Sequence, residues 1–120
     1  MIGGSTKRLP AVFYRSETGA EPVREWLKSG EFSADDRRRI GEDIKTVEFG
    51  WPVGMPTCRA LGGGLWEVRS SLKGRIARIL FCIDDGRMVL LHGFIKKAQR
   101  TPAGDLALAV KRKRSVETET

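Results

Sequence analysis

The stretch LWEVRSSLKGRIARILFCIDDGRMVLLHGFIKK, residues 65–97, decides the fold that this sequence predicts. It holds three runs in which polar and apolar residues alternate or branched and aromatic side chains dominate, as is typical of strands, at 65–72, 75–83 and 87–97. Lys73-Gly74 and Asp84-Asp85-Gly86 separate the runs, and the second is a strong hairpin signal. Strands joined by such short turns pair as neighbours, so we expect an antiparallel meander.

The flanking residues predict one more strand and three helices: a strand at 8–15, a short helix from Pro22 to Gly30, a helix at 34–48, and a last helix after Thr101-Pro102. Ser33 and Asp36 resemble a capping box at the start of the second helix. Residues 50–64 hold five glycines and two prolines and predict a loop. The sequence therefore indicates one α+β domain over residues 1–120. Its order is β-α-α-β-β-β-α, with helices packed on one face of a small antiparallel sheet. We expect 1–7 and 115–120 to be flexible.

The net charge of +7 is concentrated in the second half of the chain. Residues 1–50 hold nine Lys or Arg and nine Asp or Glu, whereas residues 51–120 hold thirteen against six. Such asymmetry is typical of a nucleic-acid-binding face, although a charge that only promotes solubility is the alternative. The arginines Arg37, Arg38 and Arg39 lie among carboxylates and predict a solvated helix face.

Several protein classes are disfavoured by composition. No stretch approaches the roughly 20 apolar residues of a membrane helix. The two cysteines, Cys58 and Cys82, form no CxxC, and with a single histidine they make no recognisable zinc site. A reducing, cytoplasmic location without a disulfide fits best. We see neither converging carboxylates for a two-metal nuclease nor a phosphate-binding glycine loop, so we expect no metal and no cofactor.

Strand alternation places Glu67 and Arg69 on one face, away from the core face of Trp66 and Val68. Arg78 lies within an otherwise apolar strand, where an unpaired charge would cost several kcal/mol. Two readings weigh equally here. Either Arg69 and Arg78 project into one phosphate site, or Arg78 forms a structural ion pair with Glu67.

His92, the only histidine, lies among Leu90, Leu91 and Phe94. A hydrogen-bonded structural role is the more common fate of such a residue, and a role in carrying a proton near neutral pH is the alternative. Lys96, Lys97 and Arg100 follow without an intervening acid, which favours anion binding.

These motifs carry a family resemblance that covers about residues 9–113. They are VREWL, Gly-Trp-Pro, Leu-Trp-Glu-x-Arg, Arg-Ile-Leu-Phe, and His-Gly-Phe-Ile-Lys-Lys followed by Thr-Pro and a helix. In these motifs the chain resembles the phage-derived, HigB-like branch of the RelE/HigB toxin superfamily. The resemblance implies a RelE-like fold and the toxin of a type II toxin–antitoxin module, which enters the ribosomal A site and cleaves mRNA. It also implies a helix-turn-helix antitoxin of the HigA/XRE type as partner.

The resemblance implies basic active-site positions at Arg69, Arg78 and Lys96 or Lys97. The tyrosine that RelE places after the last strand has no counterpart, since the only tyrosine is Tyr14. We expect metal-free attack by the RNA 2′-hydroxyl, with charge stabilisation by the arginines and His92 as proton carrier. The expected catalytic residues are Arg69, Arg78, His92 and Lys97, and the expected RNA-binding residues are Lys73, Arg75, Lys96 and Arg100.

Two rival readings stay open. The first is a non-enzymatic module that holds nucleic acid on the same platform. The second is a degenerate toxin whose remaining role is regulatory, as the partner of a helix-turn-helix antitoxin.

Overall fold

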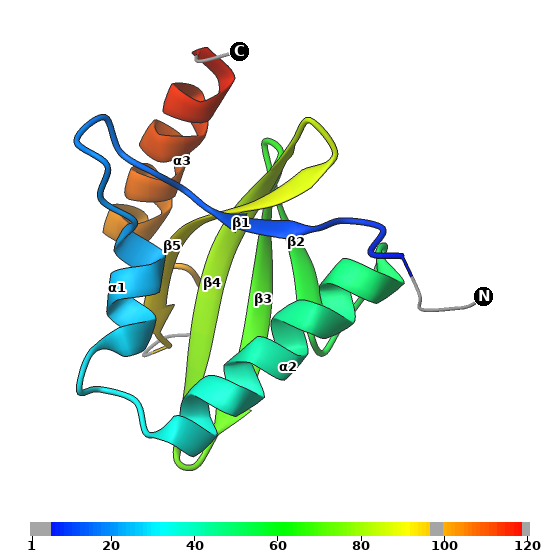
Figure 1. The fold of residues 1–120 in the computed structure, drawn as a ribbon, viewed down its shortest axis with the longest axis vertical. Helices are drawn as coiled ribbons and strands as arrows, with labels where there is room; N and C mark the ends of the chain where they lie inside the picture. The colour runs from blue at the N-terminus through cyan, green and yellow to red at the C-terminus, as the bar shows by residue number, and fades with distance from the viewer. Residues whose placement is uncertain (1–5, 97–99, 119–120) are drawn as a thin grey trace.

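The structure, a computed structural model, describes residues 6–96 and 100–118 of the 120-residue chain (Figure 1). Its elements are β1 (Ala11–Phe13), α1 (Pro22–Lys28), α2 (Ala34–Gly50), β2 (Cys58–Gly62), β3 (Leu65–Leu72), β4 (Arg75–Asp84), β5 (Arg87–Ile95) and α3 (Ala103–Thr118). The predicted α+β class is confirmed. None of the helices in the described part of the chain is long and apolar enough to cross a membrane.

The strands form one five-stranded sheet in the order β1-β5-β4-β3-β2. The predicted meander is confirmed, because β3, β4 and β5 pair antiparallel in sequence order. The turn between β4 and β5 places Asp85 and Gly86 at φ 52° and 70°, the left-handed geometry that tight hairpins need. Strand β1 pairs parallel to β5, so the sheet is mixed rather than purely antiparallel.

Strand β2 corrects the prediction of a loop over residues 50–64. It pairs antiparallel with β3, with Arg59 opposite Glu67 and a bulge between Ala60 and Gly62. The surrounding glycines and prolines hid this strand, because such residues normally mark turns. An edge strand of five residues needs only one neighbour, and β3 supplies it.

Helices cover both faces of the sheet, whereas the sequence predicted one. On one face, side chains of α1 and α2 form a core with alternate residues of the strands, including Ile79 and Phe81. On the other face, Leu80 and Cys82 pack with Ala109 of α3. Successive residues of β4 point to opposite faces, and both sets are buried, which explains why this strand is apolar almost throughout. Figure 1 shows α2 crossing the sheet in the foreground.

The helix ends follow local chemistry. Ser33 caps α2 as predicted: its hydroxyl accepts from the Asp36 amide, and the Asp36 carboxylate accepts from the Ser33 amide. Arg38 pairs with Asp35 and Glu42 on the exposed side of α2, which confirms the solvated face.

Helix α3 continues to Thr118, so it includes residues 115–118 of the tail that the sequence predicted to fray. The remaining predicted flexible ends, 1–5 and 119–120, lie outside the described residues.

Candidate phosphate-binding site

A buried ion pair joins the two central strands on the face that α3 covers. Arg78 of β4 donates through Nε to a carboxylate oxygen of Glu67 on β3 at 2.5 Å, and its Nη2 also contacts that oxygen. The Glu67 side chain is 0% exposed and that of Arg78 is 1%. Arg78 is cross-strand partner to Arg69, so it lies diagonally across from Glu67, within reach of a long side chain. The predicted Arg78–Glu67 pair is therefore present.

Two further arginines approach the same carboxylate. Arg59 Nη2 lies 3.7 Å from Glu67 Oε2, and Arg69 Nε lies 3.6 Å from Glu67 Oε1. These arginines are 35% and 18% exposed, respectively. The structure thus places Arg69 and Arg78 at the same carboxylate, while their joint binding of a phosphate stays a prediction. Arg59 was not predicted, because it belongs to β2.

The cluster has more positive groups than negative ones. Three guanidinium groups from three adjacent strands surround one carboxylate. Among the described residues, three buried atoms of the cluster make no hydrogen bond, namely Arg59 Nε, Arg78 Nη1 and Glu67 Oε1. Buried donors without acceptors are costly, and guanidinium pairs with oxyanions in charge-assisted bonds. A second anion, such as a phosphate, would satisfy the surplus donors.

An open pocket of about 470 Å³ lies next to the cluster. It is lined by Arg59, Leu61, Arg100, Thr101 and Leu106. Arg78 Nη2 donates to the hydroxyl of Thr101 at 3.0 Å, so Thr101 connects the buried arginine to the pocket wall. Thr101 lies two residues before the first residue of α3, Ala103, so the predicted Thr101-Pro102 helix start also contributes to the site.

His92 is held beside the cluster by helix α3. Its Nε2 lies 2.6 Å from Asp105 Oδ1, and its side chain is 16% exposed. The ring of Phe94 connects the two features. His92 stacks on it at 5.7 Å between ring centroids, and the guanidinium of Arg78 lies 5.3 Å from its centroid. An imidazole oriented by a carboxylate can carry a proton or serve structure alone.

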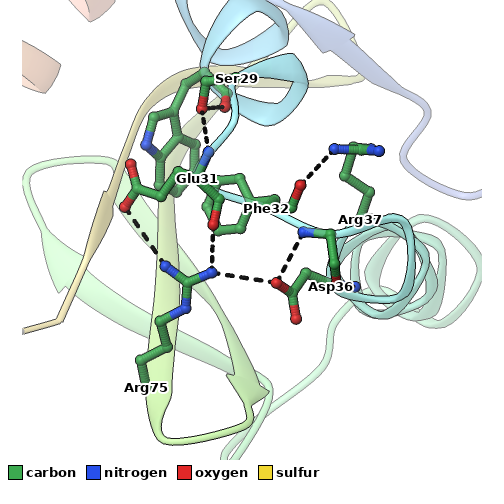
Figure 2. A network of polar contacts seen from close by, with 8 residues as sticks. Ser29, Glu31, Phe32, Asp36, Arg37 and Arg75 are labelled. Atoms are coloured by element: carbon green, nitrogen blue, oxygen red, sulfur yellow. Dashed lines mark hydrogen bonds and ion pairs between the residues drawn. The ribbon is translucent and has the colours of Figure 1, made fainter.

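Arg75 lies apart from the cluster, because strand alternation turns its side chain to the opposite face of the sheet. Figure 2 shows the polar contacts that it makes there. Its Nη2 donates to the carbonyl oxygen of Glu31 at 2.5 Å and to Asp36 Oδ2 at 3.2 Å. The guanidinium also lies 5.1 Å from the ring centroid of Phe32. The hydrogen bond that the Ser33 backbone amide donates to the Asp36 carboxylate is the main reason why the pKa of Asp36 is below its usual value. The hydrogen bond from Arg75 lowers that pKa further. Arg75 thus connects β4 to the start of α2.

Three of the remaining predicted cations, Lys73, Lys96 and Arg100, lie within the described residues. Lys73 is exposed in the turn between β3 and β4. Lys96 follows β5, where its amide donates to the carbonyl of Ile76 at 2.7 Å. Arg100 lines the pocket beside Arg59. Lys97 lies outside the described residues.

The described part of the chain also holds potential metal ligands and two cysteines. No group of three potential metal ligands occurs in residues 6–96 and 100–118. Cys58 and Cys82 are both buried and free, and they belong to the cores on opposite faces of the sheet. Burial raises the pKa of each thiol to about 11.

Comparison with known proteins identifies a family. No curated protein matches the chain significantly. Residues 25–114, or 90 of the 120 residues, match the family described as Phage derived protein Gp49-like (DUF891). This span contains β2 to β5, the whole arginine cluster, and α3 as far as residue 114. The chain therefore belongs to the Gp49-like family, a toxin–antitoxin-associated family related to RelE and HigB.

Proposed function

We propose that this protein is the toxin of a type II toxin–antitoxin module and that it cleaves mRNA on the ribosome without a metal. Family membership supports the toxin role, since Gp49-like proteins are commonly such toxins. The observation that carries the cleavage chemistry is the cluster in which Arg59, Arg69 and Arg78 surround the single carboxylate of Glu67. Surplus guanidinium donors in a largely buried setting favour the binding of a phosphodiester.

The reaction needs no group that the chain lacks. The 2′-oxygen of the RNA attacks the adjacent phosphorus, and the bond to the 5′-oxygen of the next nucleotide breaks. One product ends in a 2′,3′-cyclic phosphate and the other begins with a 5′-hydroxyl. Arg69, which is partly exposed, binds the phosphoryl oxygens, while buried Arg78 and Glu67 hold the cluster in shape. Charge that develops on these oxygens meets donors that are already in place.

Proton transfer is assigned to His92, which accepts the proton that the 2′-hydroxyl loses and returns it to the departing 5′-oxygen. Asp105 fixes its imidazole at 2.6 Å, which makes Asp105 a positioning residue. The only tyrosine, Tyr14, is not available for this task at the cluster, because its ring packs against Arg112, whose guanidinium lies 5.5 Å from the ring centroid. Lys96, Lys97 and Arg100 follow β5 and hold the RNA backbone on either side of the scissile phosphate.

The test is to induce the chain alone in a bacterium and to map mRNA 5′ ends, then to repeat the cleavage with purified ribosomes. Wild-type protein should arrest growth and produce 5′-hydroxyl ends within codons. An mRNA with one 2′-deoxynucleotide at a mapped site should resist cleavage there. Arg69→Gln should abolish cleavage. Arg24→Gln is the matched control, since Arg24 is exposed on α1 and pairs only with Glu21 among its described partners.

The proposal fails if the 2′-deoxy substrate is cut as fast as RNA, or if folded Arg69→Gln retains full activity. A second candidate, a binding partner of a helix-turn-helix antitoxin without catalytic activity, is favoured by two observations. The carboxylate of Glu67 is occupied by arginines, and the family tyrosine is absent at the cluster. RNA binding that depends on Arg69, with no new mRNA ends, would establish this alternative.

A further inference from the structure

The pocket beside the arginine cluster has the chemistry of a nucleobase site. Two of the five described residues that line it, Leu61 and Leu106, are aliphatic and only partly buried, and both pack against the core under α3. Two others, Arg59 and Arg100, carry planar guanidinium groups. Single-stranded RNA is commonly read by apolar and guanidinium surfaces that stack on its bases. The volume of about 470 Å³ falls within the range of known ligand pockets, about 300–1,000 Å³.

The pocket and the arginine cluster around Glu67 share one residue. Arg59 lines the pocket and also lies 3.7 Å from the carboxylate of Glu67. Its Nε is buried and makes no hydrogen bond within the described residues. Thr101, which also lines the pocket, accepts a hydrogen bond from Arg78 of the same cluster. A nucleotide whose phosphate meets the cluster therefore has its base within reach of the pocket.

The polar lining is rich in donors. Arg59 and Arg100 donate only, none of the described residues that line the pocket carries a carboxylate, and the Thr101 hydroxyl already accepts from Arg78. Uracil presents its O4 carbonyl and guanine its O6 carbonyl as acceptors, whereas cytosine and adenine carry an amino donor at the corresponding position, N4 or N6, so the two keto bases fit this lining better. We propose that this pocket, formed by Arg59, Leu61, Arg100, Thr101 and Leu106, binds a keto base of the RNA next to the scissile phosphate. This inference rests on the proposed RNA-cleaving function and adds a substrate preference to it.

The test uses the purified full-length chain, labelled with ¹⁵N and with methyl ¹³C at leucine, and titrated by NMR with inorganic phosphate, ribose 5-phosphate, UMP and CMP. Wild-type protein should bind UMP about tenfold more tightly than ribose 5-phosphate and CMP, the lower end of what one Arg–base pair contributes. Leu61 and Leu106 methyl signals should shift with UMP and stay in place with phosphate. Leu61→Ala should reduce UMP affinity to that of ribose 5-phosphate, and Arg100→Gln should remove the preference over CMP. Leu108→Ala is the control, because Leu108 lies on the same helix and lines a different pocket.

The outcomes distinguish base binding in the pocket from phosphate binding at the arginine cluster. If UMP and ribose 5-phosphate bind with equal affinity and Arg69→Gln loses both, base binding is overturned and phosphate binding at the cluster is supported. Equal affinity for UMP and CMP, both above ribose 5-phosphate, overturns the keto preference. Binding of none of the four ligands overturns both. Mapped mRNA ends provide a second readout, since U or G should be enriched beside the cut in wild type and not in Arg100→Gln.

Discussion

Arg78 donates through Nε to the carboxylate of Glu67 at 2.5 Å, and neither side chain is more than 1% exposed. Breaking a buried pair of this kind leaves the other charge without compensation and costs about 3–5 kcal/mol. We therefore expect Glu67→Gln to lower the free energy of unfolding by about that amount, as measured by urea denaturation. Sulfate should restore part of this loss and should stabilise the variant more than the wild type, because the surplus guanidinium groups then lack their anion.

Glu42→Gln is the matched control for this change. Glu42 is exposed and pairs with Arg38 on the surface of α2, so its loss should cost less than about 1 kcal/mol. Equal small effects of both substitutions would show that the buried pair contributes little to stability.

Gly93 allows Trp26 of α1 to lie directly on strand β5. A Cβ atom at residue 93 would overlap with the Cζ3 and Cε3 atoms of Trp26. The indole cannot easily retreat, because Phe32 packs edge-on against it at 4.8 Å between ring centroids. Gly93→Ala should therefore lower the free energy of unfolding by about 1–3 kcal/mol through overpacking.

Gly41→Ala should raise the free energy of unfolding, in contrast to Gly93→Ala. Gly41 lies within α2, and nothing is within 4 Å of the position its Cβ would take. The substitution should stabilise the protein by about 0.4–1 kcal/mol, because alanine restricts the unfolded chain and favours helix. Thermal melts of both variants test the pair, and stabilisation by Gly93→Ala would contradict the close contact with Trp26.

Arg75 and Arg69 should respond differently to the same substitution. Arg75 connects β4 to Glu31 and Asp36 on the face opposite the cluster (Figure 2). Its guanidinium is partly exposed, so Arg75→Gln should cost about 1 kcal/mol of stability and leave mRNA cleavage intact. Arg69→Gln should abolish cleavage with little change in stability. A loss of cleavage in folded Arg75→Gln would extend the RNA-binding surface to the second face.

The buried thiols make stability fall at high pH. Burial raises the pKa of Cys58 and Cys82 from 9.0 to about 11. Between pH 9 and 11 the unfolded chain therefore loses thiol protons that the folded chain keeps, so the free energy of unfolding decreases with rising pH. Below pH 9 this contribution is constant. Urea denaturation from pH 7 to 10.5 tests it, and Cys82→Ala should show a shallower decline than wild type over the upper part of that range.

Most of the sheet could be predicted because the sequences of β3, β4 and β5 each show a pattern that is typical of strands. Alternation in residues 65–72 correctly separated Trp66 and Val68 from Glu67 and Arg69. Strand β2 was missed because five residues flanked by glycine and proline carry no periodicity of their own. Its arginine, Arg59, is a site residue only through pairing with β3.

Partners distant in sequence could not be predicted either. Alternation places Arg75 on its face, but Glu31 and Asp36 are 44 and 39 residues away, and only the docking of α2 brings them to it. The position of α3 had a signal that the prediction did not use. Strand β4 is apolar at both odd and even positions, from Ile79 to Cys82, which is typical of a strand covered on both faces.

Substitutions of His92 distinguish a catalytic role of this residue from a structural one. If it carries a proton, His92→Gln should reduce ribosome-dependent cleavage by about 10²–10⁴-fold while the protein stays folded, because glutamine preserves a hydrogen bond to Asp105 and cannot exchange a proton. Imidazole added to His92→Ala should restore part of the activity. Asp105→Asn should lower the single-turnover rate less than His92→Gln and leave RNA affinity unchanged, as expected for a residue that only orients the ring. A His92→Gln protein that melts at a lower temperature but cleaves at the wild-type rate would make the Asp105–His92 pair a purely structural link between α3 and β5.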